Sequence, residues 1–347
     1  MKVGIVGYGS YIPKFRIRVE EIAKVWKQDF EKIKKNLLIE EKSVSSQDQD
    51  CVTLATQAAQ NALNRASLDR KKIGALYVGS ESHPYAVKPT STIVGTSLNL
   101  SNNYMAADLE FACKAGTAAI QICLGLVKSG LIEYGLAIAS DTAQSTPGDI
   151  LEYSAGSASA AFIIGRDEKE IVATIDATQS YTTDTPDFWR RGLEKYPQHA
   201  GKFTSEPAYF KHVLGVTELI MQKTGTTPKD FDYVIFHQPN GKFPTLAAKR
   251  LGFTTKQLEQ SLLVTKIGNS YSASTPISLA HILDIAQKDQ KILVTSYGSG
   301  SGSDSFILTT TAKLKDIQKK APTTKFYVDQ KEYLDYSIYR KNIETII

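Results

Sequence analysis

One cysteine lies in a sequence context that suits a nucleophile. Cys113 belongs to the stretch Glu110-Phe-Ala-Cys-Lys-Ala-Gly-Thr-Ala-Ala119, which follows the expected end of a buried strand at residues 104–111 and precedes an apolar run at residues 118–127. This pattern predicts a strand-to-helix turn at the sulfur. Unpaired amide groups and the positive end of the helix dipole would favour the thiolate there. Small residues on both sides leave room for an acyl group, so we predict that Cys113 attacks an acyl substrate.

Three further side chains follow expected strands or begin an expected helix. Glu81 comes just after a strand at residues 73–79, in the region where open α/β sheets build their sites, although a glutamate in a loop is most often only a solvated acid. His237 directly follows a strand at residues 231–236, and Asn269 lies in a turn into a helix, where asparagine is often only a cap. Their shared placement at equivalent ends of two repeated units is a stronger indication than any one of them.

Together these four residues predict acyl transfer. Cys113 would take an acyl group from a thioester. Its backbone N–H and one from the turn at residues 298–300 would hold the oxyanion. His237 and Asn269 would polarise the carbonyl of a second substrate, and Glu81 would remove a proton next to a carbonyl.

The other cysteines suggest no metal or redox chemistry. The chain has three cysteines, Cys51, Cys113 and Cys123, and none forms a CxxC pair. This spacing argues against a zinc site and a redox dithiol. Cys51 and Cys123 lie in apolar helical patterns, so we expect both to be small core residues.

Composition describes an ordinary globular protein. The chain has 347 residues, of which 42% are hydrophobic and 22% charged, and this length predicts two domains or one duplicated unit. The net charge of +5 comes from scattered lysines and arginines with no basic run among aromatics, which argues against a nucleic-acid partner. No apolar run is long enough for a bilayer and the N-terminus lacks a signal-peptide layout, so we expect a cytoplasmic protein without a membrane partner.

The elements that must position these residues occur in two similar series. Each half contains the same series: a strand, a small-residue turn into a helix, a second strand, a small-residue or glycine-rich turn, and a third strand. The expected strands are residues 73–79, 134–141 and 161–164 in the first half and 231–236, 291–296 and 305–310 in the second. This order predicts an internal duplication.

We place the two halves at residues 1–166, with Glu81 and Cys113, and 167–347, with His237 and Asn269. Within the second half, residues 182–226 are polar, aromatic and irregular, and we interpret them as an insertion that covers a site. The aromatic tail from residue 325 predicts either a docked strand and helix or a surface for another chain.

Five motifs resemble the hydroxymethylglutaryl-CoA synthase family of the thiolase superfamily, in its shorter archaeal form. They are Gly79-Ser-Glu-Ser82, Ala112-Cys-Lys-Ala-Gly-Thr-Ala-Ala119, His237-Gln-Pro-Asn-Gly-Lys242, Gly268-Asn-Ser-Tyr-Ser-Ala-Ser274 and Ser296-Tyr-Gly-Ser-Gly300. The resemblance runs over essentially the whole chain. It implies an α/β thiolase-like fold, in which two duplicated halves form a five-layered αβαβα arrangement.

The resemblance also implies a reaction, with Glu81, Cys113 and His237 as the catalytic triad. Acetyl-CoA acetylates Cys113, and Glu81 removes a proton from the acetyl methyl group. The resulting carbanion equivalent attacks the C3 carbonyl of acetoacetyl-CoA, which His237 and Asn269 polarise. Hydrolysis of the enzyme thioester releases 3-hydroxy-3-methylglutaryl-CoA, a precursor of mevalonate and isoprenoids.

Further positions follow from the same resemblance. Lys242 is expected to line the CoA entrance, Ser299 and Gly298 to face the oxyanion, and Thr117 and Ser272 to contact substrate or CoA. The substrates are CoA thioesters, and neither a bound cofactor nor a metal is expected. Where many relatives have Tyr-Gly after the cysteine, this chain has Lys114-Ala115.

The resemblance extends to assembly. It implies at least a homodimer, and a complex with an acetoacetyl-CoA thiolase and a small zinc-ribbon/OB-fold protein that passes the intermediate between active sites.

Three alternatives remain open from the sequence. A 3-oxoacyl-carrier-protein synthase III-like enzyme shares the Cys, His and Asn, but it obtains its carbanion by decarboxylation and needs no base, so Glu81 argues against it. A plain thiolase would normally carry a second catalytic cysteine late in the chain, where this chain has none after Cys123. A non-catalytic subunit that only binds acyl-CoA would be expected to have lost a triad position.

Overall fold

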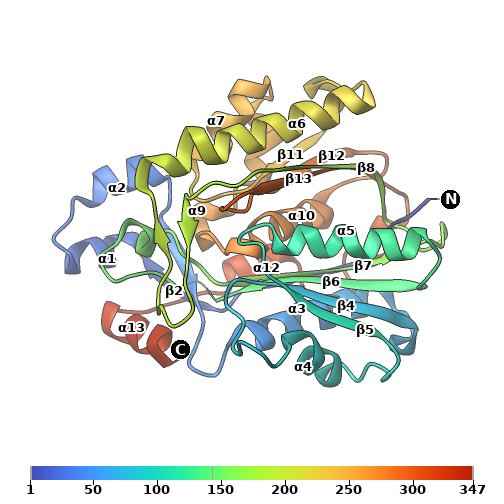
Figure 1. Ribbon diagram of the computed structural model, residues 1–347, viewed down its shortest axis with the longest axis horizontal. Coiled ribbons are helices and arrows are strands. Elements are labelled where there is room, and N and C mark those ends of the chain that lie inside the picture. The colour runs from blue at the N-terminus through green and yellow to red at the C-terminus, as the bar shows by residue number, and fades with distance from the viewer. Residues whose placement is uncertain (1, 143, 346–347) are drawn as a thin grey trace.

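The chain forms five alternating layers of helices and sheets (Figure 1). The computed structural model describes residues 2–142 and 144–345. The first sheet contains β1 (Gly4–Tyr11), β4 (Ile73–Gly79), β5 (Met105–Leu109), β6 (Tyr134–Asp141) and β7 (Ala158–Gly165). The second contains β8 (Ala173–Thr182), β11 (Tyr233–Phe236), β12 (Lys291–Thr295) and β13 (Gly302–Thr310).

Three helical layers cover the faces of these sheets (Figure 1). The central layer contains α5 (Ala115–Lys128) and α10 (Ser274–Ile285). The outer layers contain α3 (Cys51–Ala66) and α4 (Thr90–Ser97) on one side and α6 (Lys211–Thr224) and α7 (Lys242–Leu251) on the other. Every residue of α10 from Ser274 to Leu283 is buried, as a helix between two sheets requires.

The strand topology repeats between the halves. The first half has the order β5-β4-β6-β7-β1 and the second β11-β12-β13-β8, and the two orders meet where β1 pairs with β8. In both halves the first two equivalent strands, β4 with β6 and β11 with β12, are parallel, and the strands that follow pair antiparallel. This correspondence agrees with the predicted duplication, while the boundary at residue 166 remains a prediction.

Several expected elements have the predicted bounds and two expectations were wrong. β4 and β6 begin and end where the sequence places them. The strand before Cys113, β5, is not buried, because it is the last strand of the sheet and Met105 is 37% exposed. The insertion is not irregular throughout, since α6 occupies residues 211–224 and buries Val213, Val216 and Ile220 at helical spacing.

The aromatic tail is docked on the N-terminal part of the chain, which confirms the first of the two predicted alternatives. β14 (Glu332–Tyr333) pairs in parallel with β2 (Phe15–Arg18), which pairs with β3 (Glu41–Val44). α12 (Thr324–Asp329) and α13 (Tyr336–Thr345) flank β14. α1 (Val19–Val25), α2 (Phe30–Leu37) and α9 (Val264–Ile267) lie near this region, while α8 (Thr255–Leu258) contacts α7 and β11, and α11 (Leu314–Ile317) precedes α12 in the chain. In the part of the chain that the structure describes, no helix combines the length and apolar character needed to cross a bilayer.

Candidate active site

The predicted nucleophile lies in the turn from β5 to α5. Cys113 is 5% exposed, and Ala112 before it has the left-handed φ of 43° that the sharp turn requires. Gly79 allows close approach of this turn, because a Cβ atom there would lie 2.3 Å from the backbone of Ala115. The strand-to-helix turn predicted at the sulfur is confirmed.

The thiol of Cys113 donates a hydrogen bond to Glu81. Sγ lies 3.3 Å from Oε1 of Glu81, which follows β4 as predicted. Burial and the neighbouring Asp141 charge raise the pKa of Glu81 to about 8, although the Cys113 hydrogen bond and the Arg190 charge act to lower it. The nucleophile and the expected base are therefore in direct contact.

The expectation that helix α5 would hold Cys113 as a thiolate was wrong. Burial is the largest cause that raises the pKa of the Cys113 thiol well above its ordinary value, and the Glu81 charge is the next. The amides of Lys114 and Ala115 are also engaged, because they donate to the carbonyls of Phe111 and Ala112. Cys113 is thus a protonated thiol with an adjacent carboxyl acceptor.

Asp141, at the end of β6, fixes the loop that carries Glu81. Its Oδ1 accepts hydrogen bonds from the Glu81 amide at 2.9 Å and from the hydroxyls of Ser80 and Ser82 at 2.7 Å. Its Oδ2 accepts the Ser272 amide at 2.8 Å. Asp141 is visible in the sequence as an acid at the end of the expected strand at residues 134–141. Nothing in the sequence indicated that it would hold the Glu81 loop in place.

Cys113 lines a largely apolar cavity of about 250 Å³ that also has polar groups on its wall. His237, Asn269 and Ser299 line the same cavity, so the structure brings together the predicted residues of both halves. Its apolar wall comes from α2, the turn before β7, the insertion and α7: Leu37, Ile150, Leu151, Phe188, Tyr209 and Phe243. A cavity of this form suits a thioester group at the end of a long, flexible arm.

His237 and Asn269 can both donate a hydrogen bond into this cavity. His237 is 1% exposed, and burial lowers its pKa to about 3, so its imidazole is neutral. The Asn269 Oδ1 accepts the Tyr271 amide at 3.0 Å, which leaves the NH₂ end of the side chain as the donor. Two neutral donors beside a thiol suit the polarisation of a carbonyl oxygen.

The turn after β12 offers a different oxyanion donor from the one predicted at Gly298. The Gly298 amide donates to the Gly302 carbonyl at 2.8 Å, so this N–H is already engaged. The Gly300 amide likewise donates to Asp187 at 2.8 Å. Ser299 lies between them on the cavity wall. The structure corrects the prediction for Gly298, and the oxyanion role of Ser299 stays a prediction.

Asp187, in the insertion, holds this turn in place. Besides the Gly300 amide, its buried carboxylate accepts the hydroxyls of Tyr297 at 2.6 Å and Thr185 at 2.8 Å. The sequence showed only that Asp187 begins a charged aromatic stretch in a covering segment.

Thr117 and Ser272 do not face the cavity, contrary to the prediction that they contact substrate. The Thr117 hydroxyl lies 2.9 Å from Asp304 and 2.8 Å from Ser296, and the Ser272 hydroxyl donates to the Gly79 carbonyl. Both side chains join the two halves behind the cavity wall. Lys242 is the exposed first residue of α7, next to Asn240, which lines the cavity.

Lys114 has a buried ion pair rather than an exposed position. Its Nζ lies 3.0 Å from Asp304 Oδ2 on β13, and both side chains are at most 7% exposed. The pair connects the Cys113 turn of the first half to the second sheet.

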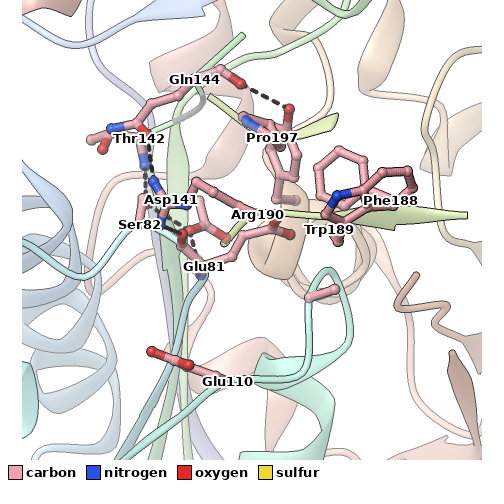
Figure 2. A pocket seen from close by; sticks show the side chains of 12 residues that line it. Glu81, Ser82, Glu110, Asp141, Thr142, Gln144, Phe188, Trp189, Arg190 and Pro197 are labelled. Carbon is pink, nitrogen blue, oxygen red and sulfur yellow. Dashed lines mark hydrogen bonds between the residues drawn. The ribbon is translucent and has the colours of Figure 1, made fainter. Parts of the chain in front are cut away.

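Glu81 lies on the wall of a second cavity, which has a volume of about 240 Å³ (Figure 2). Glu81, Asp141 and Gln144 line it, together with Trp189 and Arg190 of the insertion. Arg190 reaches from β9 (Phe188–Trp189) toward Glu81 and donates to its carbonyl at 2.9 Å. The insertion, which also includes β10 (Gln198–His199), therefore contributes to the wall of this cavity, and its role as a cover stays a prediction.

His199 of the insertion lines the first cavity and lies 3.2 Å from Asp149. The sequence suggested only a loop histidine there, since its partner is distant in the chain. Within residues 2–142 and 144–345, no group of three or more His, Cys, Asp or Glu side chains could hold a metal ion.

The fold occurs in solved structures of related enzymes. A structure of MvaS in complex with 3-hydroxy-3-methylglutaryl coenzyme A has a TM-score of 0.90 at 22% identity, covering 99% of this chain and 92% of that one. A hydroxymethylglutaryl-CoA synthase complexed with CoA also has a TM-score of 0.90, at 24% identity, covering 99% and 90%. The chain therefore has the thiolase-like fold of these structures, which confirms the predicted fold class.

Sequence relatives make the assignment more specific. The hydroxymethylglutaryl-CoA synthase of Methanocaldococcus jannaschii is 57% identical over 338 residues, covering 97% of both chains. That of Methanobrevibacter smithii is 56% identical over 339 residues, covering 98% of both chains. This chain belongs to the hydroxymethylglutaryl-CoA synthase family.

Part of the second half also matches a family model of the 3-oxoacyl-carrier-protein synthase III alternative. Residues 221–310 match the model of the 3-oxoacyl-[acyl-carrier-protein] synthase III C-terminal family. This segment is the part of the second half that contains β11, β12 and α10. Because the hydroxymethylglutaryl-CoA synthases match over nearly the whole chain, they decide against that alternative and against a non-catalytic subunit.

Proposed function

We propose that this chain condenses acetyl-CoA with acetoacetyl-CoA and water to give 3-hydroxy-3-methylglutaryl-CoA and CoA, in the mevalonate route to isoprenoids, through an acetyl-Cys113 intermediate. The observation that carries the proposal is the contact of 3.3 Å between Cys113 and Glu81, beside the cavity that His237 and Asn269 line. It places a nucleophile, a base and two carbonyl donors within one site.

In the first step Cys113 attacks the thioester of acetyl-CoA. Glu81 accepts the thiol proton and passes it to the departing CoA sulfur. The Cys113 amide and the Ser299 amide hold the oxyanion while the acetyl group is transferred. A raised carboxyl pKa suits this exchange, because a base works best with a pKa near the ambient pH.

In the second step Glu81 removes a proton from the acetyl methyl group. The carbanion equivalent attacks the C3 carbonyl of acetoacetyl-CoA, which His237 and Asn269 polarise. The neutral imidazole donates a hydrogen bond to the C3 oxygen, and the proton taken by Glu81 is returned to that oxygen, so the C3 hydroxyl forms and Glu81 is again a carboxylate. Hydrolysis of the Cys113 thioester then releases the product.

The arms of both CoA substrates would use the apolar cavity in turn. Lys242 and the N-terminus of α7 lie beside Asn240 on its wall, so we propose that they attract the CoA phosphates. No bound cofactor or metal is part of this proposal.

We further propose a cytoplasmic homodimer or larger assembly. Following the resemblance, its partners would be an acetoacetyl-CoA thiolase and a small zinc-ribbon/OB-fold protein. Analytical ultracentrifugation of the three proteins, alone and mixed, tests this assembly. Separate sedimentation of all three would contradict it.

An assay with two alternative donors tests the reaction. Purified protein is mixed with acetoacetyl-CoA and either acetyl-CoA or malonyl-CoA, and products are separated by chromatography. The proposal predicts 3-hydroxy-3-methylglutaryl-CoA from acetyl-CoA without release of carbon dioxide. Turnover that requires malonyl-CoA and releases carbon dioxide would indicate the decarboxylating alternative.

A further inference from the structure

Among the residues that the structure describes, the two cavities beside the Glu81–Cys113 pair share two wall residues. Cys113, His237 and Asn269 line the first cavity, whereas Glu81 and Asp141 line the second. Phe188 and Tyr271 line both, with ring centroids 6.0 Å apart. These two rings therefore form a partition between the cavities.

The second cavity is polar and reaches solvent. Its wall includes the carboxyl groups of Glu81 and Glu110, the amide of Gln144 and the guanidinium of Arg190 (Figure 2). Glu110 and Arg190 are exposed residues, and Trp189 at the same cavity is 39% exposed. A space of about 240 Å³ with several polar groups meets the conditions for ordered water.

The first cavity has a different character. Its wall is mainly aliphatic and aromatic, and under the proposed function it holds the CoA arm of the acceptor. That arm is still bound when the thioester to Cys113 must be hydrolysed. Water that came through the first cavity would have to pass both the arm and the acyl chain.

We propose that the second cavity is a water compartment that supplies the hydrolytic water to acyl-Cys113, an inference that rests on the proposed function. Glu81 lines this cavity and accepts a hydrogen bond from the Cys113 sulfur. It therefore connects the water to the thioester.

Hydrolysis of acyl-Cys113 needs only water and groups already present in the site. The water oxygen forms a bond to the thioester carbonyl carbon while Glu81 takes one water proton. Collapse of the tetrahedral intermediate breaks the bond between carbon and Sγ, and Glu81 returns its proton to the sulfur. The products are a carboxylic acid and the free Cys113 thiol, at the expense of one water molecule.

Gln144 offers a way to fill the compartment without changing a reacting group. Its Oε1 accepts Arg190 at 3.0 Å, and its carbonyl accepts the Tyr271 hydroxyl at 3.2 Å. Gln144→Trp adds bulk to the cavity. Gln144→Met removes the amide with little change in volume and serves as the matched control.

Quenched-flow mass spectrometry of the intact protein separates the steps. Acetyl-CoA is added first and acetoacetyl-CoA second, and acyl groups on Cys113 are followed in time. Gln144→Trp should acetylate and condense as wild type does, but it should hydrolyse at least about tenfold more slowly, so that the 3-hydroxy-3-methylglutaryl adduct accumulates. Gln144→Met should hydrolyse near the wild-type rate.

Trp189→Ala provides an independent test, because it opens the compartment instead of filling it. Without acetoacetyl-CoA, acetyl-Cys113 should be lost to water several-fold faster in this variant than in wild type. The inference is overturned if Gln144→Trp hydrolyses at the wild-type rate, if Gln144→Met is slowed equally, or if Trp189→Ala leaves the loss unchanged. Absence of acetyl-Cys113 in the wild type would instead overturn the proposed function.

Discussion

The Cys113 sulfur lies 3.3 Å from Oε1 of Glu81, with the thiol as the donor. The pair joins a turn before the central helix α5 to the end of strand β4, and Asp141 fixes the loop of Glu81. Burial favours the protonated form of each group. The thiol is thus protonated at rest, and the ionised fraction of Glu81 can accept its proton.

The pH dependence of condensation should follow Glu81. Its raised pKa of about 8 means that the carboxylate, which is the base, becomes populated only as pH rises toward 8. The rate of condensation from preformed acetyl-Cys113 should increase by up to about tenfold per pH unit below pH 8 and then level off. Single-turnover kinetics across this range measure it, and a flat profile would contradict the assignment.

Replacing Glu81 by glutamine should stabilise the folded protein at alkaline pH. The pKa of the Glu81 carboxyl rises on folding from 4.5 to about 8. The carboxyl therefore stabilises the folded state less and less as the pH increases from 4.5 to 8. Glu81→Gln should therefore gain free energy of unfolding relative to wild type, on the order of 2 kcal/mol near pH 8 and little near pH 4.5. Urea unfolding of both proteins at several pH values tests the difference. A difference that is independent of pH would argue against the raised pKa.

His237 should affect condensation more than acetylation. His237→Ala removes a neutral donor to the second substrate, and it leaves Cys113 and Glu81 in place. We expect condensation to fall about 10²-fold or more, with acetylation by acetyl-CoA within a few-fold of wild type. Separate assays of the two half-reactions measure this. An equal loss in both would mean that His237 acts on the nucleophile instead.

Asp187 should act through the turn that carries Ser299. In Asp187→Asn the NH₂ group of the new amide cannot accept a hydrogen bond, so at least one of the three donors around the carboxylate loses its partner. Displacement of the turn should lower kcat by about 10- to 100-fold with a smaller change in KM. Tyr297→Phe, which removes only one donor, is the milder control. A rise in KM with kcat unchanged would place the role of Asp187 in substrate binding.

The sequence allowed prediction of the reacting groups because each follows a recognisable local pattern. Glu81 and His237 come directly after apolar strands, and Cys113 lies in a small-residue turn. The repeated order of strands implied that these strand ends meet, and the cavity brings Cys113, His237 and Asn269 together.

The residues that hold these groups could not be predicted in this way. Asp141 contacts Glu81 across 60 residues of sequence, and Gly300 lies 113 residues from Asp187. Such contacts depend on three-dimensional packing and leave no local pattern. The thiol pKa was wrongly expected to be low for the same reason, since burial and the Glu81 charge arise only in the folded chain.

Mass spectrometry of acyl groups on Cys113 tests most directly whether Cys113 carries the acetyl group and whether Glu81 is the base for condensation. Wild type and Glu81→Ala are mixed with acetyl-CoA and digested, and acetoacetyl-CoA is then added to each undigested mixture. We predict acetyl-Cys113 in both proteins, formed more slowly in Glu81→Ala because the thiol has lost its proton acceptor, and condensation only in wild type. Condensation at the wild-type rate in Glu81→Ala, or no acetyl group on Cys113 in either protein, would contradict it.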